Sequence, residues 1–139
     1  MTQNEKDLLI KDLCARLDTN LVCSIYRTDD EGVGYRDEIL HGYCKGDIWY
    51  EFYFREDCSI GIDNVSKIKP YLFPLSSMTE EQKRELTNLV EETAFQILHS
   101  EDDNPHFHIA MDWYNKNHFD YRGLIPMGQA NDATGLNIY

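Results

Sequence analysis

Apolar residues in the first part of the chain recur every three or four positions, which is typical of one face of a helix. A helix is therefore predicted over about residues 4–17, and Thr2 and Glu5 have the spacing of a capping box at its start. The apolar stripe consists of Leu8, Leu9, Ile10, Leu13, Cys14 and Leu17. The basic residues Lys6, Lys11 and Arg16 stand beside acidic ones, and we expect them on the solvent-facing side.

The period of the pattern shortens to about two residues after position 20, which predicts strands. The predicted strands are 21–27, 35–44, 48–55 and 58–63, and the turns between them include 28–34 and 45–47. Connections this short favour an antiparallel meander, because parallel pairing needs longer crossovers. Small sheets often curl toward a half-barrel, and the sequence leaves that open.

A segment with two prolines, residues 68–75, follows the predicted strands. Pro70 and Pro74 lack a backbone N–H, so we predict an irregular extended segment and not a central strand.

A second helix is predicted to start at Thr79, which forms a capping box with Gln82. Its apolar stripe is Leu86, Leu89, Val90, Thr93, Ala94, Ile97 and Leu98. Asn104 and Pro105 predict the start of a third helix over about 105–116, with the stripe Phe107, Ala110, Met111 and Tyr114. The remaining tail has no long period, and we expect it to wrap the domain at least through Ile125.

These patterns predict a single α+β domain over residues 1–139. It comprises an N-terminal helix, a four-stranded antiparallel sheet, two C-terminal helices and a wrapped irregular tail. A chain of 139 residues with 42% hydrophobic residues is long and apolar enough to bury a sizeable core.

The net charge of the chain excludes two classes of binding partner. The net charge is −12, from 13 basic and 25 acidic residues, and residues 79–112 alone contribute nine acids against two bases. Ordinary binding to nucleic acid or to an anionic membrane needs clustered Lys and Arg, so neither is expected. The N-terminus lacks the apolar core of a signal peptide, which favours a cytoplasmic location. The cysteines Cys14, Cys23, Cys44 and Cys58 form no C-x-x-C pair, and we expect reduced, buried thiols.

A group of histidines and aspartates near the C-terminus could carry chemistry, because imidazole and carboxylate are good metal ligands. Its members are His106, His108, Asp112, His118 and Asp120. Only His108 and Asp112 have the spacing that shares one helix face, and the group matches no known zinc motif. We therefore predict no cofactor and no metal site, and retain His108, Asp112, His118 and Asp120 as weak candidate ligands.

Two aromatic segments are candidates for contact with a partner. In residues 118–123, Phe119 and Tyr121 could be core residues, and Asp120 could form a salt bridge with Arg122 that pins the tail. The predicted strand 48–55 has Ile48, Tyr50, Phe52 and Phe54 on one face and Trp49, Glu51, Tyr53 and Arg55 on the other. Large aromatics beside charge are typical of interfaces. The predicted interaction residues are Trp49, Tyr53, Arg55, Trp113, Tyr121 and Arg122.

Three segments resemble an uncharacterised family of small acidic proteins from anaerobic gut bacteria and their prophages and mobile elements. They are KDLCARL at 11–17, IKPYLFPLSSMTEEQK at 68–83 and HFDYRGLIPMGQA at 118–130. The region between residues 21 and 66 matches poorly. The resemblance implies an accessory cytoplasmic role connected with mobile DNA, and it carries over no catalytic residue.

The sequence favours a non-enzymatic interaction module whose partner is a protein with a basic surface. One alternative is a small metal-dependent or His/Asp hydrolase that uses His108, Asp112 or the pair His118 and Asp120. The other alternative is an acidic DNA-mimic inhibitor. No nucleophile elbow, Walker or dinucleotide-binding glycine pattern is present, so the sequence names no reaction.

Overall fold

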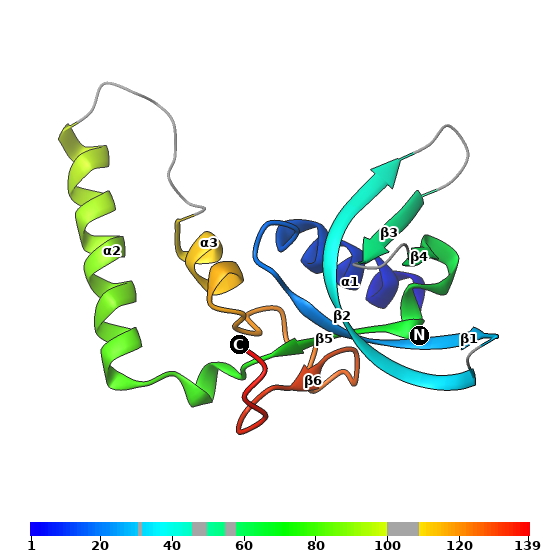
Figure 1. Cartoon of the computed structure of the whole chain (residues 1–139). Coiled ribbons are helices and arrows are strands. Elements are labelled where there is room, and N and C mark those ends of the chain that lie inside the picture. Colours follow the sequence, from blue (N-terminus) through cyan, green and yellow to red (C-terminus); the bar gives the residue numbers. More distant parts are fainter. Residues whose placement is uncertain (31, 46–49, 55–57, 100–108) are drawn as a thin grey trace.

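The computed structural model describes residues 1–30, 32–45, 50–54, 58–99 and 109–139. Helix α1 (Gln3–Ala15) begins with the predicted capping box, in which Thr2 accepts from the Glu5 amide and the Glu5 carboxylate accepts from the Thr2 amide. The box satisfies backbone donors that the first helical turn leaves without partners. The N-terminal helix is thus confirmed, and it lies across the sheet in Figure 1.

The sheet has six strands, and the prediction of four was wrong. The strands are β1 (Val22–Asp29), β2 (Gly32–Lys45), β3 (Tyr50–Phe54), β4 (Cys58–Gly61), β5 (Ile68–Leu72) and β6 (Asn131–Asp132). Their order is β4-β3-β2-β1-β5-β6, so the sheet is open, with β4 and β6 at its edges, and does not curl. The antiparallel meander of the first four strands is confirmed, whereas β5 and β6 pair in parallel.

The first hairpin is longer than the sequence predicted. Pairing continues through Thr28 opposite Val33 to Asp29 opposite Gly32, inside the segment predicted as a turn. Gly32 has a φ of 135°, which a residue with a side chain rarely adopts, so the glycine permits this short reversal. Further along β2, the register shifts between Leu40 and Gly42, where pairing with β3 begins.

Residues 68–72 form an internal strand, contrary to the prediction for this proline-containing segment. In β5, Pro70 pairs opposite Cys23 of β1, and on its other side β6 pairs only with Tyr71 and Leu72. The chain beside Pro70 is therefore paired on one side, as at a sheet edge, where a missing N–H is tolerated.

The 3₁₀ helix η1 (Ile62–Lys67) replaces the predicted end of the fourth strand and leads from β4 to β5. Its residue Val65 is fully buried in the core. Both α1 and η1 contribute to one hydrophobic cluster with the sheet and the tail. The cluster consists of Leu9, Leu13, Leu21, Cys23, Ile25, Leu40, Phe52, Phe54, Cys58, Ile60, Val65, Ile68, Leu72, Leu124 and Ala130.

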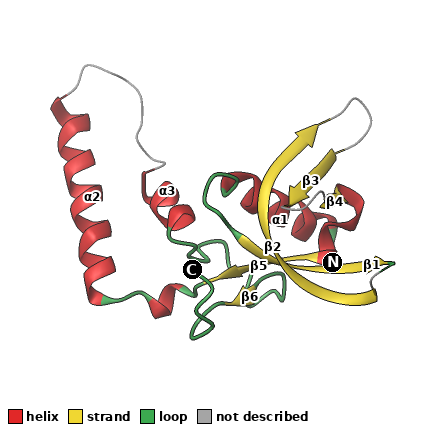
Figure 2. Ribbon diagram, viewed as in Figure 1, coloured by secondary structure: helices red, strands yellow, loops and turns green. Residues whose placement is uncertain are grey.

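The helices α2 (Glu80–His99) and α3 (Ile109–Lys116) pack against each other at one end of the sheet (Figure 2). The predicted capping box of α2 is confirmed, since Thr79 accepts from the Gln82 amide at 3.2 Å and donates its own amide to Gln82 at 2.9 Å. The predicted start of α3 at Asn104 and Pro105 lies outside the described residues. The side chains of 94–99, which include three residues of the predicted α2 stripe, also lie outside them.

The tail wraps the domain, as predicted, and also adds a strand that the sequence did not reveal. The amide of Ala133 donates to Leu72 O at 2.8 Å, which fixes β6 beside β5. At the end of the chain, the Tyr139 hydroxyl accepts from the Val22 amide at 3.2 Å and donates to Tyr71 O at 2.8 Å. The tail therefore closes over the same sheet edge that β5 would otherwise expose.

None of the four cysteines forms a disulfide, and their burial differs from residue to residue. Cys23 and Cys58 are buried as predicted, Cys14 is half-buried, and Cys44 is exposed. Burial raises the pKa of the Cys23 thiol, which keeps it protonated.

Candidate functional site

His118 lies two residues after the end of α3 and is buried, with 8% of its surface exposed. It has a φ of 59° and its ring stacks on Tyr139, with ring centroids 3.7 Å apart. Burial lowers the pKa of His118 to about 4, and the nearby charge of Arg16 adds to this effect. The imidazole is therefore neutral near pH 7, and its buried Nδ1 has no hydrogen-bond partner among the described residues.

Asp120 is committed to the backbone of the tail. Its two carboxylate oxygens accept from the amides of Leu124 and Ile125, both at 2.8 Å. Two such bonds hold a tight turn that carries Leu124 into the core, where it is fully buried. This arrangement commits both carboxylate oxygens of Asp120 to the backbone of the tail.

The four weak candidate ligands do not meet in the described structure. Asp112 is exposed on α3, whereas His118 and Asp120 are buried, and His108 lies outside the described residues. Among the residues that the structure describes, no three His, Cys, Asp or Glu side chains are placed to hold a metal ion. The alternative of a hydrolase therefore receives no support from these three side chains.

A buried ionic network, which the sequence placed on the solvent-facing side of α1, joins this helix to the tail. Arg16 is fully buried and binds both carboxylate oxygens of Asp12, with Nε at 2.8 Å and Nη2 at 3.0 Å. Its Nη2 also donates to Phe119 O at 2.8 Å, and its Nη1 lies 3.4 Å from the carbonyl oxygens of Tyr114 and Asn115. The expectation of an exposed Arg16 was wrong, because these carbonyls lie about a hundred residues away in sequence.

Arg122 completes the network at its outer side. Its Nε donates to Asp12 Oδ1 at 3.2 Å, and its guanidinium lies 4.7 Å from the centre of the Tyr121 ring. Arg122 and Asp120 thus have different partners in the described structure, whereas the sequence suggested a salt bridge between them. The one sequence signal for this network was the spacing of Asp12 and Arg16. Side chains at positions i and i+4 of a helix are neighbours, so a carboxylate and a guanidinium there can pair.

The aromatic candidates of the C-terminal part contact one another. Trp113 is 6% exposed and stacks on Phe119, with ring centroids 5.6 Å apart, and Tyr114 stacks on Tyr121 at 5.5 Å. The buried face of α3 differs from the predicted apolar stripe. Met111 belongs to that stripe but is 44% exposed, whereas Trp113 lies outside it and is buried. Trp113 also donates from Nε1 to Glu85 at 3.2 Å, which ties α3 to α2.

On β3, the structure confirms Phe52 and Phe54 as core residues. Tyr53, on the other face, is 38% exposed, and its hydroxyl donates to Glu51 Oε2 at 3.1 Å. This hydrogen bond raises the pKa of Tyr53. Trp49 and Arg55 lie outside the described residues, so Glu51 and Tyr53 are the members of this predicted face that the structure places.

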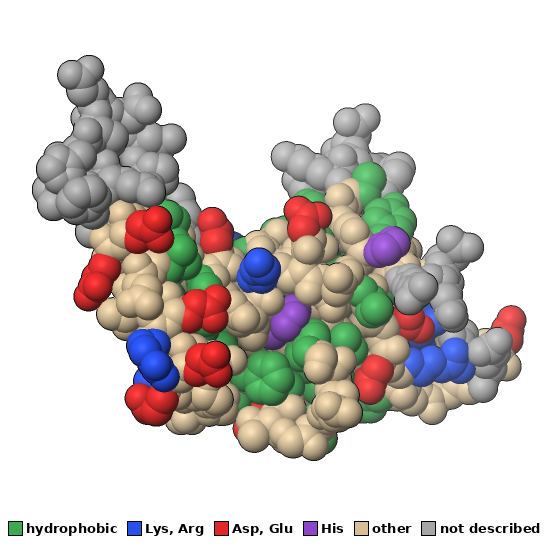
Figure 3. All heavy atoms as spheres, turned by 60° about the vertical axis from the view of Figure 1, so that its left-hand side comes forward, with side chains coloured by type: hydrophobic (Ala, Val, Ile, Leu, Met, Phe, Trp, Pro, Cys, Tyr) green, Lys and Arg blue, Asp and Glu red, His purple; other side chains and the backbone are tan. Residues whose placement is uncertain are grey.

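The surface of α2 is the largest exposed acidic feature of the described helices. Its exposed residues from position 80 to 93 are Glu80, Glu81, Lys83, Arg84, Glu85, Thr87, Asn88, Val90, Glu91 and Glu92. Figure 3 shows acidic side chains gathered on the side of the molecule that α2 forms. Leu86 and Leu89, predicted as part of a buried stripe, are only half-buried.

Comparisons with protein families, with curated proteins and with solved structures found no match to this chain. The structure itself shows an α+β fold with a six-stranded mixed sheet. Among the described residues, no helix combines the length and the apolar character needed to cross a membrane.

Proposed function

We propose that this protein is a non-enzymatic interaction module that uses the exposed face of α2 to bind a protein with a basic surface. One observation carries the proposal: α2 leaves most of its described side chains in solvent, and the charged ones among them are five Glu against two basic residues. The resemblance to small acidic proteins of bacteria and their mobile elements supports an accessory role in the cytoplasm.

The helix is well formed although it is largely exposed. Its capping box satisfies the first backbone donors, and Lys83 pairs with Glu80 at 2.9 Å on the surface. Isolated helices are marginal in water and are stabilised chiefly by packing, which here comes from α3 through Trp113. One flank of α2 is therefore fixed to the domain, and the other remains available to a partner.

The exposed flank has the composition of a contact surface. Val90 is 44% exposed, and Glu91 and Glu92 directly follow it in the sequence. An exposed apolar residue on a charged helix provides contact area, while the charges select the partner and accelerate its approach. The carboxylates favour a partner rich in Lys and Arg, whose association should weaken as salt increases.

Charge reversal on α2 tests this proposal. The double variant Glu91→Lys with Glu92→Lys changes two exposed side chains of α2. We expect it to abolish the capture of basic proteins that the wild-type protein retains from a bacterial lysate at low salt. Quantitative mass spectrometry of wild-type and variant eluates measures the difference.

The matched control is the double variant Asp18→Lys with Asp63→Lys, which makes the same change in net charge at exposed positions outside α2. The proposal requires proteins whose capture is lost with the α2 variant, kept with the control, and weakened by added salt. Equal losses in both variants, or no difference from wild type in either, would show that α2 is not the contact surface. Circular dichroism establishes that each variant is folded.

A further inference from the structure

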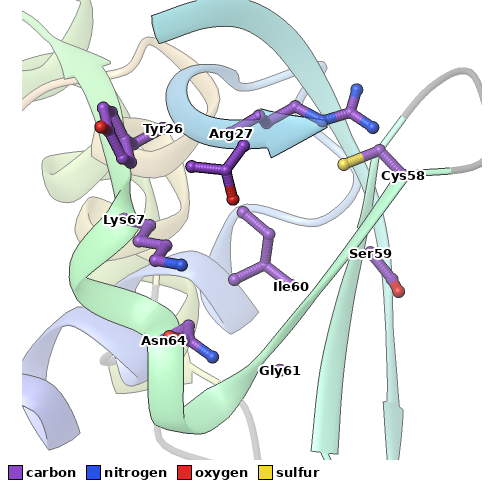
Figure 4. Close-up of a pocket in the computed structure, with 9 residues that line it drawn as sticks. Tyr26, Arg27, Cys58, Ser59, Ile60, Gly61, Asn64 and Lys67 are labelled. Carbon is purple, nitrogen blue, oxygen red and sulfur yellow. The ribbon is translucent and has the colours of Figure 1, made fainter. Parts of the chain in front are cut away.

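A polar pocket opens on the side of the sheet away from α2. It has a volume of about 410 Å³ and lies where β1, β4 and η1 meet (Figure 4). Its described lining comes from residues 26–28 of β1, 58–61 of β4, and 64 and 67 of η1. Its volume falls within the range of about 300–1,000 Å³ that is usual for small-molecule sites.

The pocket forms where the apolar pattern of two strands ends. Along β1, Cys23 and Ile25 are fully buried, and Arg27 follows two positions later on the same face of the strand. In β4, Cys58 and Ile60 are buried and close the inner side. An arginine thus occupies the next position of a core stripe, which places a cation at the margin of the core.

The 3₁₀ helix η1 forms the opposite wall. Val65 anchors η1 in the core, and Asn64 and Lys67 extend from it toward β4 in Figure 4. Lys67 is half-buried, and within the described part of the chain it has no ion pair or hydrogen bond. The ammonium group of Lys67, which has hydrogens to donate, is directed into the pocket in Figure 4.

The charge of this pocket is opposite to that of the molecule. The chain has 25 acidic and 13 basic residues, yet the described residues of the lining include two basic side chains and no Asp or Glu. The other polar side chains of the described lining are those of Tyr26, Thr28, Ser59 and Asn64, all of which can donate hydrogen bonds. Donors and positive charge in this described lining are suited to an anionic ligand.

We propose that this pocket binds the phosphate group of a small molecule. Lys67 supplies positive charge from η1, Arg27 adds positive charge at the margin of the core, and Asn64 and Thr28 supply neutral donors. A phosphate is an acceptor with several oxygens, so it can use donors from both η1 and β1, and Lys binds phosphate in proteins. The volume beyond one phosphate group accommodates the organic part of the ligand. This site shares no residue with α2 and does not depend on the function proposed for it.

Amide spectra of the ¹⁵N-labelled full chain test the site, with inorganic phosphate, glucose 6-phosphate and glucose as probes. We expect both phosphates, but not glucose, to cause saturable shifts at residues 26–28 and 58–67. Tighter binding of glucose 6-phosphate identifies a phosphorylated metabolite as the ligand class, and equal binding identifies phosphate itself. Shifts that do not saturate, or that glucose reproduces, would overturn the proposal.

Two lysine variants localise the binding. Lys67→Gln should weaken phosphate binding about tenfold or more, because it removes a charged hydrogen bond. Lys69→Gln removes the same charge two residues further along, at a position that does not line the pocket, and should change the affinity less than about twofold. Equal weakening by both variants would mean that only the overall charge matters, and the assigned pocket would be wrong.

Discussion

Replacing Arg16 by methionine should be among the most damaging single changes outside the apolar core. The variant Arg16→Met keeps the apolar stem of the side chain but removes every donor of the guanidinium. It breaks the bonds of 2.8 and 3.0 Å to Asp12 and the bond of 2.8 Å to Phe119 O. The Asp12 carboxylate, itself fully buried, then retains the Arg122 contact at 3.2 Å.

The magnitude follows from this loss. Removing one partner of a buried ion pair costs about 3–5 kcal/mol, because the remaining charge stays out of water without adequate compensation. The free energy of unfolding of a domain is typically about 5–15 kcal/mol, so Arg16→Met should remove a large part of it. Equilibrium unfolding in urea, followed by circular dichroism, measures the change.

A second variant separates the buried charge from general loss of packing. If the uncompensated carboxylate causes the damage, Asp12→Asn combined with Arg16→Met should be more stable than Arg16→Met alone, by about 1 kcal/mol or more. A cost below about 1 kcal/mol for Arg16→Met would refute the reasoning. The reasoning would also be refuted if the double variant lost as much free energy of unfolding as Asp12→Asn and Arg16→Met lose together as single variants.

Two further predictions concern the tail. His118 has a pKa lowered from 6.5 to about 4 in the folded protein, so the unfolded chain takes up the proton first as pH falls. The stability due to neutral His118 is complete above pH 6.5 and is lost as pH decreases toward 4, which amounts to about 2 kcal/mol between pH 7.5 and 5. Urea unfolding across this range should show the loss in wild type and a smaller one in His118→Asn, and identical pH profiles would contradict it. Gly123→Ala should cost about 1–2 kcal/mol of unfolding free energy in the same assay, because φ is 75° there while the added Cβ meets only ordinary contacts at 3.9 Å. Gly42→Ala is its control, since it has open space and no positive φ, and an equal cost at both glycines would rule out backbone strain as the cause.

The sequence predicted the elements whose determinants are local. The starts of α1 and α2 are fixed by capping boxes within four residues, Thr2 with Glu5 and Thr79 with Gln82, and both are present. The antiparallel meander also follows from short connections, because neighbouring strands joined by a few residues have little choice of partner.

The candidate site was less predictable, because its residues are defined by distant partners. Among the predicted interaction residues, Trp113 is buried against Phe119, and Arg122 binds Asp12 on the first helix. The pocket beside η1 joins β1 to a segment more than thirty residues later, and no local motif marks its two basic residues. Residue type indicated polar or aromatic chemistry but not the direction in which a side chain faces.

Periodicity and capping in the sequence by themselves determined an α+β chain with a helix before a meander and helices after it. Only the tertiary structure decided that β5 is internal, that a two-residue strand from the tail pairs beside it, and that Arg16 is buried. The reason is physical: a backbone segment such as 131–132 has almost no intrinsic preference for a strand, and it becomes one because β5 offers unpaired groups. In the same way, a guanidinium can be buried only where carbonyl oxygens converge, and here those oxygens come from residues 114–119.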